Sequence, residues 1–213
     1  MEITLMSSII VYESREVKPK GLNKADVINH EKLLDYFLEE DYERLSQLDT
    51  IKLNHNKEKI SLLYPGCGAD IMFPLVYLHK LFPEAKKVKL VFVDYEDNLG
   101  IIKTVLDEVG VSFKGKKSKI KFYWHNKLIT LKFIPKRIED HLKKEKKFDV
   151  YFEKAFRLMR DQIHGYEDRV VSLLNEGGVL ISDTGFLKKE LKYVEVPKNL
   201  SSYGEMVLGI KKS

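Results

Sequence analysis

The sequence predicts an α/β protein with a doubly wound, mostly parallel seven-stranded sheet, an antiparallel terminal hairpin strand and an N-terminal helical extension. Three observations lead to this prediction. From Lys59 onward, short buried strands alternate with helical patterns, as in parallel sheets that carry helices on both faces. A glycine-rich turn joins the first of these strands to a helix. The last two strands are joined by a short polar connection, which indicates an antiparallel pair.

Length and composition agree with a globular α/β protein. The chain has 213 residues, of which 44% are hydrophobic and 32% charged, enough apolar material for one sizeable core. A single cysteine cannot form an internal disulfide, which indicates a reducing compartment. The first residues lack a signal-peptide pattern, and no apolar run is long enough to cross a bilayer. We therefore expect a cytoplasmic protein without a membrane partner.

Residues 1–58 are expected to form an extension that precedes the sheet domain, 59–213. A strand is predicted at 3–12, followed by a polar connector and a helical pattern over 24–49. These helices either form part of a ligand site or pack against the edge of the sheet, and the pattern does not choose between the two.

The sheet domain begins with a buried strand over 59–64, and a second buried strand ends at Asp94. Between them, apolar residues recur at helical spacing, and a further helix ends at the capping Gly110. The region that follows alternates as a β-hairpin turning at 125–127, whose second arm serves as the third strand of the sheet. The remaining prediction is a short helix after Pro135, strands at 148–153 and 179–183, a helix over 155–174 broken at Gly165, a turn at 175–178, a short helix at 186–191, and final strands at 191–196 and 205–212.

The stretch LLYPGCGADI, residues 62–71, carries the clearest chemical signal. A strand must turn sharply into a helix here. Gly66 and Gly68 permit positive φ and remove side chains that would collide with a ligand. The helix start then offers free N–H groups to an anion or a polar group. Asp94 follows Gly68 by about 26 residues, near the spacing of about 20 at which a carboxylate accepts from ribose hydroxyls. The pattern therefore predicts a nucleotide-type ligand in the crevice at the strand ends.

Together, LLYPGCGADI, VFVDYEDN, FDVYF, LLNEGGVLISD and GEMVLGIKK resemble a class I S-adenosylmethionine-dependent methyltransferase over about 150 residues. The resemblance implies a reversed final strand and S-adenosylmethionine as cofactor. It implies that Gly66 and Gly68 pass under the methionyl part, that Asp94 holds the ribose hydroxyls and that Tyr95 lies near the adenine. The cofactor-binding set that follows from it is Tyr64, Pro65, Gly66, Cys67, Gly68, Asp70, Asp94, Tyr95, Arg137, Ile138 and Glu153.

The glycine motif departs from the family pattern. Tyr64 stands where the family usually has an acid, and Asp70 replaces the third glycine. Asp70 either pairs with the cofactor's ammonium group or caps the following helix. The sequence thus predicts a methyltransferase, with a non-catalytic nucleotide-binding or scaffold protein of the same fold as the alternative. An NAD(P)-dependent oxidoreductase is disfavoured by the missing third glycine and by the terminal hairpin.

The catalytic residues are not determined by any motif. Glu153, Asp183 and Tyr64 are the candidates for a general base. A thiolate nucleophile at Cys67 lacks a paired histidine, so packing is the favoured interpretation. No metal-binding, P-loop or hydrolase motif occurs. The signature of amino-group methyltransferases is replaced by FEKAF, so a hydroxyl or carboxylate acceptor, or none, stays open, and the acceptor is unknown.

The charge pattern offers two interpretations. The net charge is +5, and two lysine-rich stretches lie at 114–121 and 143–147. They could bind phosphates, but they lack the interleaved arginines and aromatic residues that read bases, which favours a solvated surface over a nucleic-acid partner. Apolar residues on both faces of the hairpin at 120–133 suggest a homo-oligomer.

Overall fold

The computed structural model describes residues 14–144 and 146–212, so the strand predicted at 3–12 lies outside the described residues. The predicted helical region at 24–49 is broken into α1 (His30–Leu34), α2 (Glu39–Ser46) and the 3-10 helix η1 (Gln47–Thr50). The break has a local cause. The Asn29 side chain caps α1 by accepting from Lys32 N, and Asp41 turns back to accept from Leu38 N, so two helices start where one was expected.

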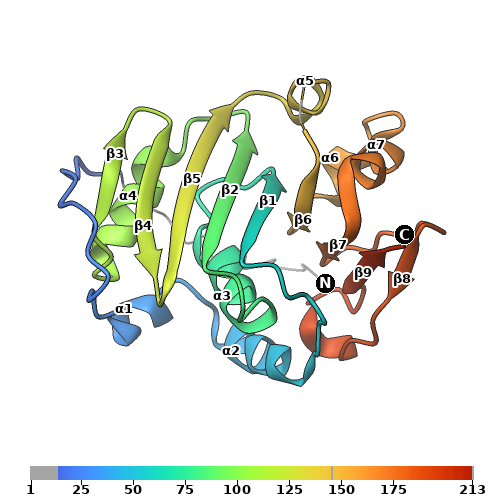
Figure 1. Ribbon diagram of the computed structural model, residues 1–213, viewed down its shortest axis with the longest axis horizontal. Coiled ribbons are helices and arrows are strands. Elements are labelled where there is room, and N and C mark those ends of the chain that lie inside the picture. The colour runs from blue at the N-terminus through green and yellow to red at the C-terminus, as the bar shows by residue number, and fades with distance from the viewer. Residues whose placement is uncertain (1–13, 145, 213) are drawn as a thin grey trace, which may run out of the picture.

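One nine-stranded sheet forms the centre of the molecule, in the order β3-β4-β5-β2-β1-β6-β7-β9-β8 (Figure 1). Strands β1, β2, β5, β6 and β7 run parallel, as predicted. Seven of the nine strands correspond to the predicted sheet, namely those that follow one another in space as β5, β2, β1, β6, β7, β9 and β8. Strand β4 is the first arm of the predicted hairpin. The strands are β1 (Lys59–Pro65), β2 (Lys87–Asp94), β3 (Phe113–Lys116), β4 (Lys119–Trp124), β5 (Lys127–Pro135), β6 (Phe148–Glu153), β7 (Leu174–Ser182), β8 (Leu191–Tyr193) and β9 (Val207–Lys211).

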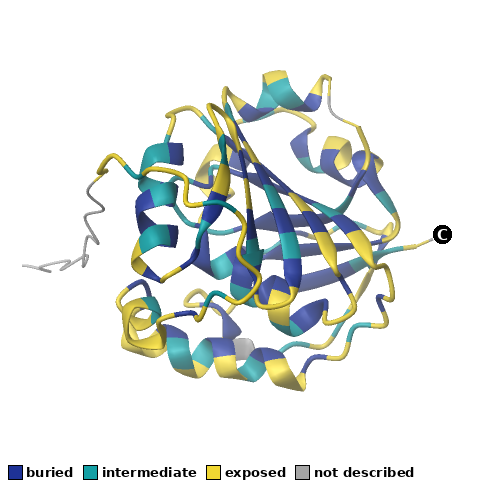
Figure 2. Cartoon of the chain, turned by 60° about the vertical axis from the view of Figure 1, so that its left-hand side comes forward, coloured by how far each residue is buried: buried dark blue, intermediate teal, exposed yellow. Residues whose placement is uncertain are grey.

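Helices cover both faces of the sheet, which confirms the doubly wound prediction. Successive residues of a strand enter different cores because side chains alternate across a sheet: Leu62 packs with one cluster and Leu63 with the other. The first core is also formed by α3 (Met72–Leu81) and α4 (Leu99–Glu108), and the second by α5 (Ile138–Leu142) and α7 (Tyr166–Leu173). Figure 2 shows the helices with their buried residues turned towards the sheet.

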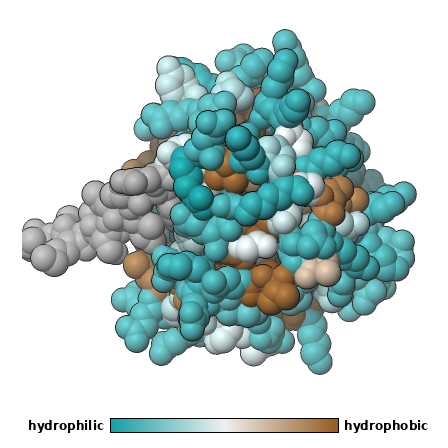
Figure 3. Space-filling view, turned by 90° about the vertical axis from the view of Figure 1, so that its left-hand side faces the viewer, coloured by the Kyte–Doolittle hydropathy of each residue, from teal (hydrophilic) through white to brown (hydrophobic). Residues whose placement is uncertain are grey.

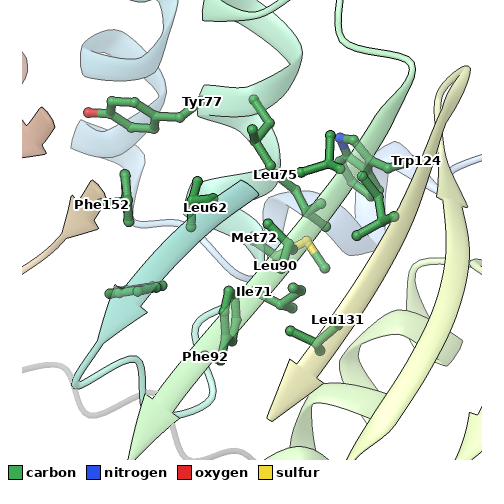
Figure 4. Close-up of a cluster of buried hydrophobic side chains, with 14 of the residues drawn as sticks. Leu62, Ile71, Met72, Leu75, Tyr77, Leu90, Phe92, Trp124, Leu131 and Phe152 are labelled. Atoms are coloured by element: carbon green, nitrogen blue, oxygen red, sulfur yellow. The ribbon is translucent and has the colours of Figure 1, made fainter. Parts of the chain in front are cut away.

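The first core is the larger one and holds the strand–loop–helix unit in place. Leu62, Leu90 and Leu131 point from neighbouring strands towards Leu75 on α3, and Trp124 fills the space near the end of β4 (Figure 4). All of these side chains are at most 1% exposed. Burial of this kind contributes about 1.5–3 kcal/mol for each large apolar side chain, so this core fixes the position of the loop that follows β1.

Strand β9 runs antiparallel to both of its neighbours, β7 and β8. The predicted antiparallel terminal pair is therefore confirmed, although β8 is shorter than the stretch 191–196. A reversed strand next to five parallel ones is the trait that the sequence resemblance implied for this fold.

Four local predictions were wrong or incomplete. Strand β3 was missed because only Phe113 points into the core. No helix forms at 186–191, where the Tyr193 hydroxyl accepts from Lys188 N and donates to backbone carbonyls. The predicted turn at 175–178 is an irregular start of β7, with Gly177 at φ 69° and a register shift against β6. The helix at 155–174 is two helices, α6 (Arg157–Arg160) and α7, with the predicted break at Gly165, φ 66°.

Candidate functional site

The glycine loop joins β1 to α3 at the carboxyl edge of the sheet. Gly66 and Gly68 both have positive φ, 57° and 51°, and Gly66 N donates to Val93 O at 2.8 Å. The two glycines differ in their surroundings. A Cβ on Gly66 would lie 2.5 Å from the Phe156 ring, whereas a Cβ on Gly68 would have nothing within 4 Å. Position 66 thus requires glycine because the Phe156 ring packs against it, whereas the space above Gly68 is open.

Asp94 lies at the end of β2, directly beside this loop. Its Oδ2 accepts from Gly68 N at 2.8 Å and its Oδ1 accepts from Glu96 N at 3.2 Å. The structure therefore places Asp94 beside the glycine loop, as expected from the sequence, although 26 residues separate it from Gly68. Each carboxylate oxygen keeps further acceptor capacity.

A pocket of ≈ 490 Å³ opens beside the loop, within the range of small-molecule sites. Five residues of the predicted cofactor-binding set line it: Gly66, Asp94, Tyr95, Arg137 and Ile138. They come from the ends of β1 and β2 and from the start of α5, and we call this space the main pocket. Tyr95 is 76% exposed and stands at its rim.

The opposite wall of the main pocket was missed by the sequence. It consists of Phe156, which precedes α6, of Met159 in α6 and of residues in the turn after the helix. No sequence motif marks these residues, and the contact between Phe156 and Gly66 joins positions far apart in the chain. Only the three-dimensional path of the segment after β6 brings them to the loop.

The buried Tyr64 and the half-buried Asp70 form a hydrogen-bonded pair under the glycine loop. The Tyr64 hydroxyl donates to Asp70 Oδ2 at 2.9 Å, and Phe73 N donates to Asp70 Oδ1 at 3.1 Å, so Asp70 caps α3 while it holds Tyr64. Burial raises the pKa of the Asp70 carboxyl, and the nearby Lys154 ammonium opposes that rise. Burial, with Asp70 adding, raises the pKa of Tyr64 well above its ordinary value. Tyr64 is therefore a neutral phenol at physiological pH.

Pro65 ends β1, and Cys67 lies between the two glycines with 2% of its surface exposed. Burial raises the pKa of the Cys67 thiol well above its ordinary value, and the Asp94 and Asp70 carboxylates add to the effect. Such a thiol is a poor nucleophile at neutral pH. The geometry thus agrees with a packing role for Cys67.

Glu153 ends β6 and is 1% exposed. Its Oε1 accepts from Arg160 Nη1 at 2.5 Å and from Ser182 Oγ at 2.6 Å, and its Oε2 accepts from the Tyr151 hydroxyl at 2.5 Å. Burial raises the pKa of Glu153, although Arg160 opposes the shift. A carboxylate with these three donors and a buried counter-ion holds the ends of β6 and β7 together, and Glu153 borders only a small cavity of ≈ 30 Å³ rather than the main pocket.

Asp183 follows β7 and faces the same small cavity. Its Oδ1 accepts from Ala155 N at 2.8 Å, and Ala155 has φ 53°, a left-handed conformation that is unusual for alanine. Burial raises the pKa of Asp183, and the Ala155 N–H and Lys154 oppose the rise. The cavity beside it, ≈ 30 Å³, has room for about one water molecule and is also lined by Asp41 and Arg44 of α2.

The N-terminal helices therefore fit both of the interpretations left open by the sequence. Helix α2 supplies part of the wall of this small cavity, and Tyr36, Phe37, Leu45 and Leu48 also join the first core.

Within residues 14–144 and 146–212, no helix is both long and apolar enough to span a membrane. In the same part of the chain, no group of three or more histidine, cysteine, aspartate or glutamate side chains is arranged to hold a metal ion.

The order of the strands and the reversal of β9 now decide the fold. It is a Rossmann-like fold with the reversed strand that the sequence resemblance implied. No protein-family model matches the sequence, and no curated protein matches it.

Solved structures similar to the chain include several methyltransferases. One is a putative class I S-adenosylmethionine-dependent methyltransferase from Listeria monocytogenes, with 13% identity, 90% of this chain and 71% of that chain covered, and a TM-score of 0.48. Another is TrmN from Thermus thermophilus, with 14% identity, coverage of 86% and 52%, and a TM-score of 0.44. A third is a methyltransferase from Geobacter sulfurreducens in complex with S-adenosyl-L-homocysteine, with 14% identity, coverage of 73% and 50%, and a TM-score of 0.41. The chain thus spans about half the length of two of these three proteins.

Proposed function

We propose that the protein binds S-adenosylmethionine in the main pocket and transfers its methyl group directly to an acceptor. The observation that carries this proposal is the position of Asp94. Its carboxylate lies at 2.8 Å from Gly68 N, at the tip of β2 and on the wall of a pocket of ≈ 490 Å³. A carboxylate beside a glycine turn at the edge of the sheet is the arrangement that accepts hydrogen bonds from ribose hydroxyls.

The residues of the site fit this cofactor. The space above Gly68 is free of atoms that a Cβ would meet, so a ligand can approach the backbone there. In the proposed arrangement, Gly66 and Gly68 pass under the methionyl part, and Asp94 accepts from the ribose. Tyr95, Arg137 and Ile138 border the adenine. Asp70 supplies the acid that Tyr64 does not, because its carboxylate is the partner that a cofactor ammonium group needs.

When bound, S-adenosylmethionine supplies an activated methyl group with a good leaving group. The chain then has to hold the acceptor in line with the methyl carbon and keep water away, which is worth several kcal/mol of the barrier. Of the three candidate bases, Asp183 is the one that is only partly buried, and it accepts fewer hydrogen bonds from the chain than Glu153, although it faces the small cavity rather than the main pocket. Glu153 is occupied by three hydrogen bonds, and Tyr64 is a neutral phenol whose hydroxyl donates a hydrogen bond to Asp70.

A second candidate function is a non-catalytic nucleotide-binding protein with the same fold. One observation favours it. The Phe156 ring lies against Gly66, on the backbone that the methionyl part would also contact. Binding would require this ring to share or leave that position. An NAD(P)-dependent oxidoreductase is less favoured because β9 is reversed. The cytoplasmic location stays a prediction, and the acceptor is unknown.

Calorimetry with S-adenosylmethionine, S-adenosylhomocysteine, NAD and NADP tests the proposal. We expect binding of the first two only, and its loss in Asp94→Ala. Glu96→Ala is the matched control, because this exposed acid is two residues away and its N–H, rather than its side chain, contacts Asp94. Binding of none of the four ligands, or equal binding by Asp94→Ala and wild type, would contradict the proposal. Binding of S-adenosylmethionine without turnover on any acceptor would favour the second candidate.

A further inference from the structure

Among the described residues, helices cover only one face of the sheet at β3, β4 and β5, whereas both faces are covered around β1. In Figure 1 the arrows of β3, β4 and β5 lie in front of α4, and no helix crosses in front of them. Helices α3 and α4 cover the other side of these strands, where Phe122, Leu131 and Phe92 are buried. The crossover after β5 carries only the five-residue helix α5, which is too short to reach across the sheet.

The uncovered face carries lysine at most of its outward positions. The register of the strands places these residues on the same side, because residues paired across strands point the same way. We call the set the lysine face. It consists of Lys87 and Lys89 from β2, Lys114 and Lys116 from β3, Lys119 and Lys121 from β4, and Lys132 from β5, all of them exposed.

Acidic residues are absent from the described strand positions of this face. Its other residues on β4 and β5 are Tyr123, Leu128, Thr130 and Ile134, and on β2 the lysines are followed by Val91 and Val93, which are buried beside α5. The seven lysines therefore concentrate more positive charge on one face than the net +5 of the whole chain. Within the described residues, none of the seven makes an ion pair. Asp149, on the same side of the sheet beside β1, is already paired with Lys57 at 2.8 Å.

Several of these lysines are direct cross-strand neighbours. Lys114 is paired with Lys121, Lys116 with Lys119, and Lys119 with Lys132. Like charges directly opposite each other destabilise a sheet, so this arrangement does not serve folding. A lysine surface that served thermal stability would be expected to contain ion-pair networks, and here the acids that such networks need are missing. The arrangement is the one expected of a surface that binds a polyanion.

A cleft of ≈ 590 Å³ continues the lysine face towards the main pocket. Lys89 and Lys132 line it together with Lys136 and Lys144, and Lys136 also borders the main pocket. Asp140 is the carboxylate among its described lining residues, and it accepts from Lys143 at 3.0 Å. The positive surface therefore extends to the rim of the glycine-loop site.

We propose that the lysine face binds the phosphate backbone of a nucleic-acid duplex without reading its sequence. Four neighbouring strands give the face a width of about 14 Å, over which a duplex presents about eight phosphate charges. Lysine meets phosphate as a point charge and lacks the fork of arginine that reads bases, so binding would depend on charge rather than on sequence.

Two other partners fit less well. A membrane surface is normally held by large apolar side chains as well as charge, and no large apolar side chain is exposed among the described residues of the lysine face. Protein interfaces are depleted in lysine. This proposal does not depend on methyl transfer.

The test is fluorescence anisotropy of labelled RNA and DNA duplexes of 20 base pairs and two unrelated sequences, over a series of salt concentrations. We expect similar affinity for both sequences and a steep loss of affinity with salt. The variant Lys89→Gln/Lys121→Gln/Lys132→Gln removes one charge from each of three strands. It should bind at least tenfold more weakly at low salt, with a slope of log K against log salt that is shallower by about 2 to 3.

The matched control is Lys52→Gln/Lys189→Gln/Lys192→Gln, which removes the same charge from exposed lysines elsewhere. It should keep most of the affinity and the slope. Equal losses in the two variants would overturn the proposal, because only net charge would then matter. No duplex binding, or binding to vesicles rich in phosphatidylserine but to neither duplex, would also overturn it. Thermal unfolding of each variant shows that the fold is intact, and S-adenosylmethionine binding by the lysine-face variant separates this surface from the main pocket.

Discussion

The two glycines of the loop can be distinguished by a single added methyl group. In Gly66→Ala, the new Cβ would lie 2.5 Å from Cδ2 and 2.7 Å from Cε2 of Phe156, a ring that is itself 2% exposed. Overpacking of this kind costs about 1–3 kcal/mol. The left-handed backbone conformation adds about 1–2 kcal/mol for a residue with a Cβ. The free energy of unfolding should therefore fall by about 2–5 kcal/mol.

Gly68→Ala is the matched control, because it has the same backbone term and no steric one. Its φ is 51°, and nothing lies within 4 Å of the added Cβ. The expected loss is about 1–2 kcal/mol. The entropy that alanine removes from the unfolded chain affects both variants alike and leaves their difference unchanged. Urea unfolding of the ligand-free protein measures both, and the melting temperature should fall by about 2–4 °C for each kcal/mol.

A double-mutant cycle identifies the cause. Phe156→Ala alone should cost about 3–5 kcal/mol, because it leaves a cavity. In the double variant Gly66→Ala/Phe156→Ala the clash is gone, so the loss should be smaller than the sum of the two single losses by about 1–3 kcal/mol. Equal losses for Gly66→Ala and Gly68→Ala, or strict additivity in the cycle, would refute this reasoning. Gly68→Ala should in addition weaken S-adenosylmethionine binding, since its methyl group fills the space above the loop.

Three further predictions concern buried and partly buried charges. Lys127→Met should lower the free energy of unfolding by about 3 kcal/mol. The reason is that Lys127 Nζ donates to the carbonyl groups of Phe82, Pro83 and Ala85, at 2.7, 2.9 and 3.0 Å, and these would lose their donor. A loss below 1 kcal/mol in urea unfolding would contradict this prediction. Glu153→Gln should cost about 2–3 kcal/mol, because it removes the buried carboxylate at 2.5 Å from the Arg160 guanidinium and leaves only the more exposed Glu167 and Asp161, at 3.4 and 3.6 Å; a melting temperature equal to that of wild type would be the contrary result. Partial burial and the stacked His79 ring, whose centroid lies 3.9 Å from that of His125, lower the pKa of His125 to about 4. The unfolded chain therefore takes up this proton first, so the stability that His125 contributes is present above pH 6.5 and is lost as the pH falls to about 4. His125→Gln should flatten the stability curve in that window, whereas an NMR titration of His125 with an ordinary midpoint would show the idea to be wrong.

The sequence predicted the parts of the fold that depend on local pattern. The strand before Gly66, the helix after it and the strand that ends at Asp94 could be read directly, because buried runs, helical spacing and glycines are local signals. The sequence also predicted that Asp94 lies close to Gly68, since the topology alone brings the carboxyl ends of neighbouring parallel strands together.

Other features depend on tertiary contacts that no local pattern contains. The Phe156 ring reaches Gly66 only because the segment after β6 folds back over the loop. Strand β3 offers only Phe113 to the core, so its lysines looked like a solvated stretch. Tyr64 replaced the expected acid, and the sequence could not show that Asp70 would be its hydrogen-bond partner.

Strand β3 also bears on how copies of this chain behave in solution. It is one of the two outermost strands of the sheet, and among the described residues Gly21 N is the backbone donor that pairs with its outer side, at Phe113 O. The hairpin that the sequence suggested as a pairing surface lies inside this edge. One of its faces is buried in the first core, and Tyr123 and Leu128 on the other face are half-buried, so homo-oligomerisation stays a prediction.

Figure 3, which looks onto this side of the molecule, shows mainly hydrophilic side chains. Lys114 and Lys116 would bring like charges together if two such edges met, and proteins commonly protect their outer strands from aggregation in this way. The charge that we assign to polyanion binding therefore also keeps the sheet from growing by the addition of a second chain.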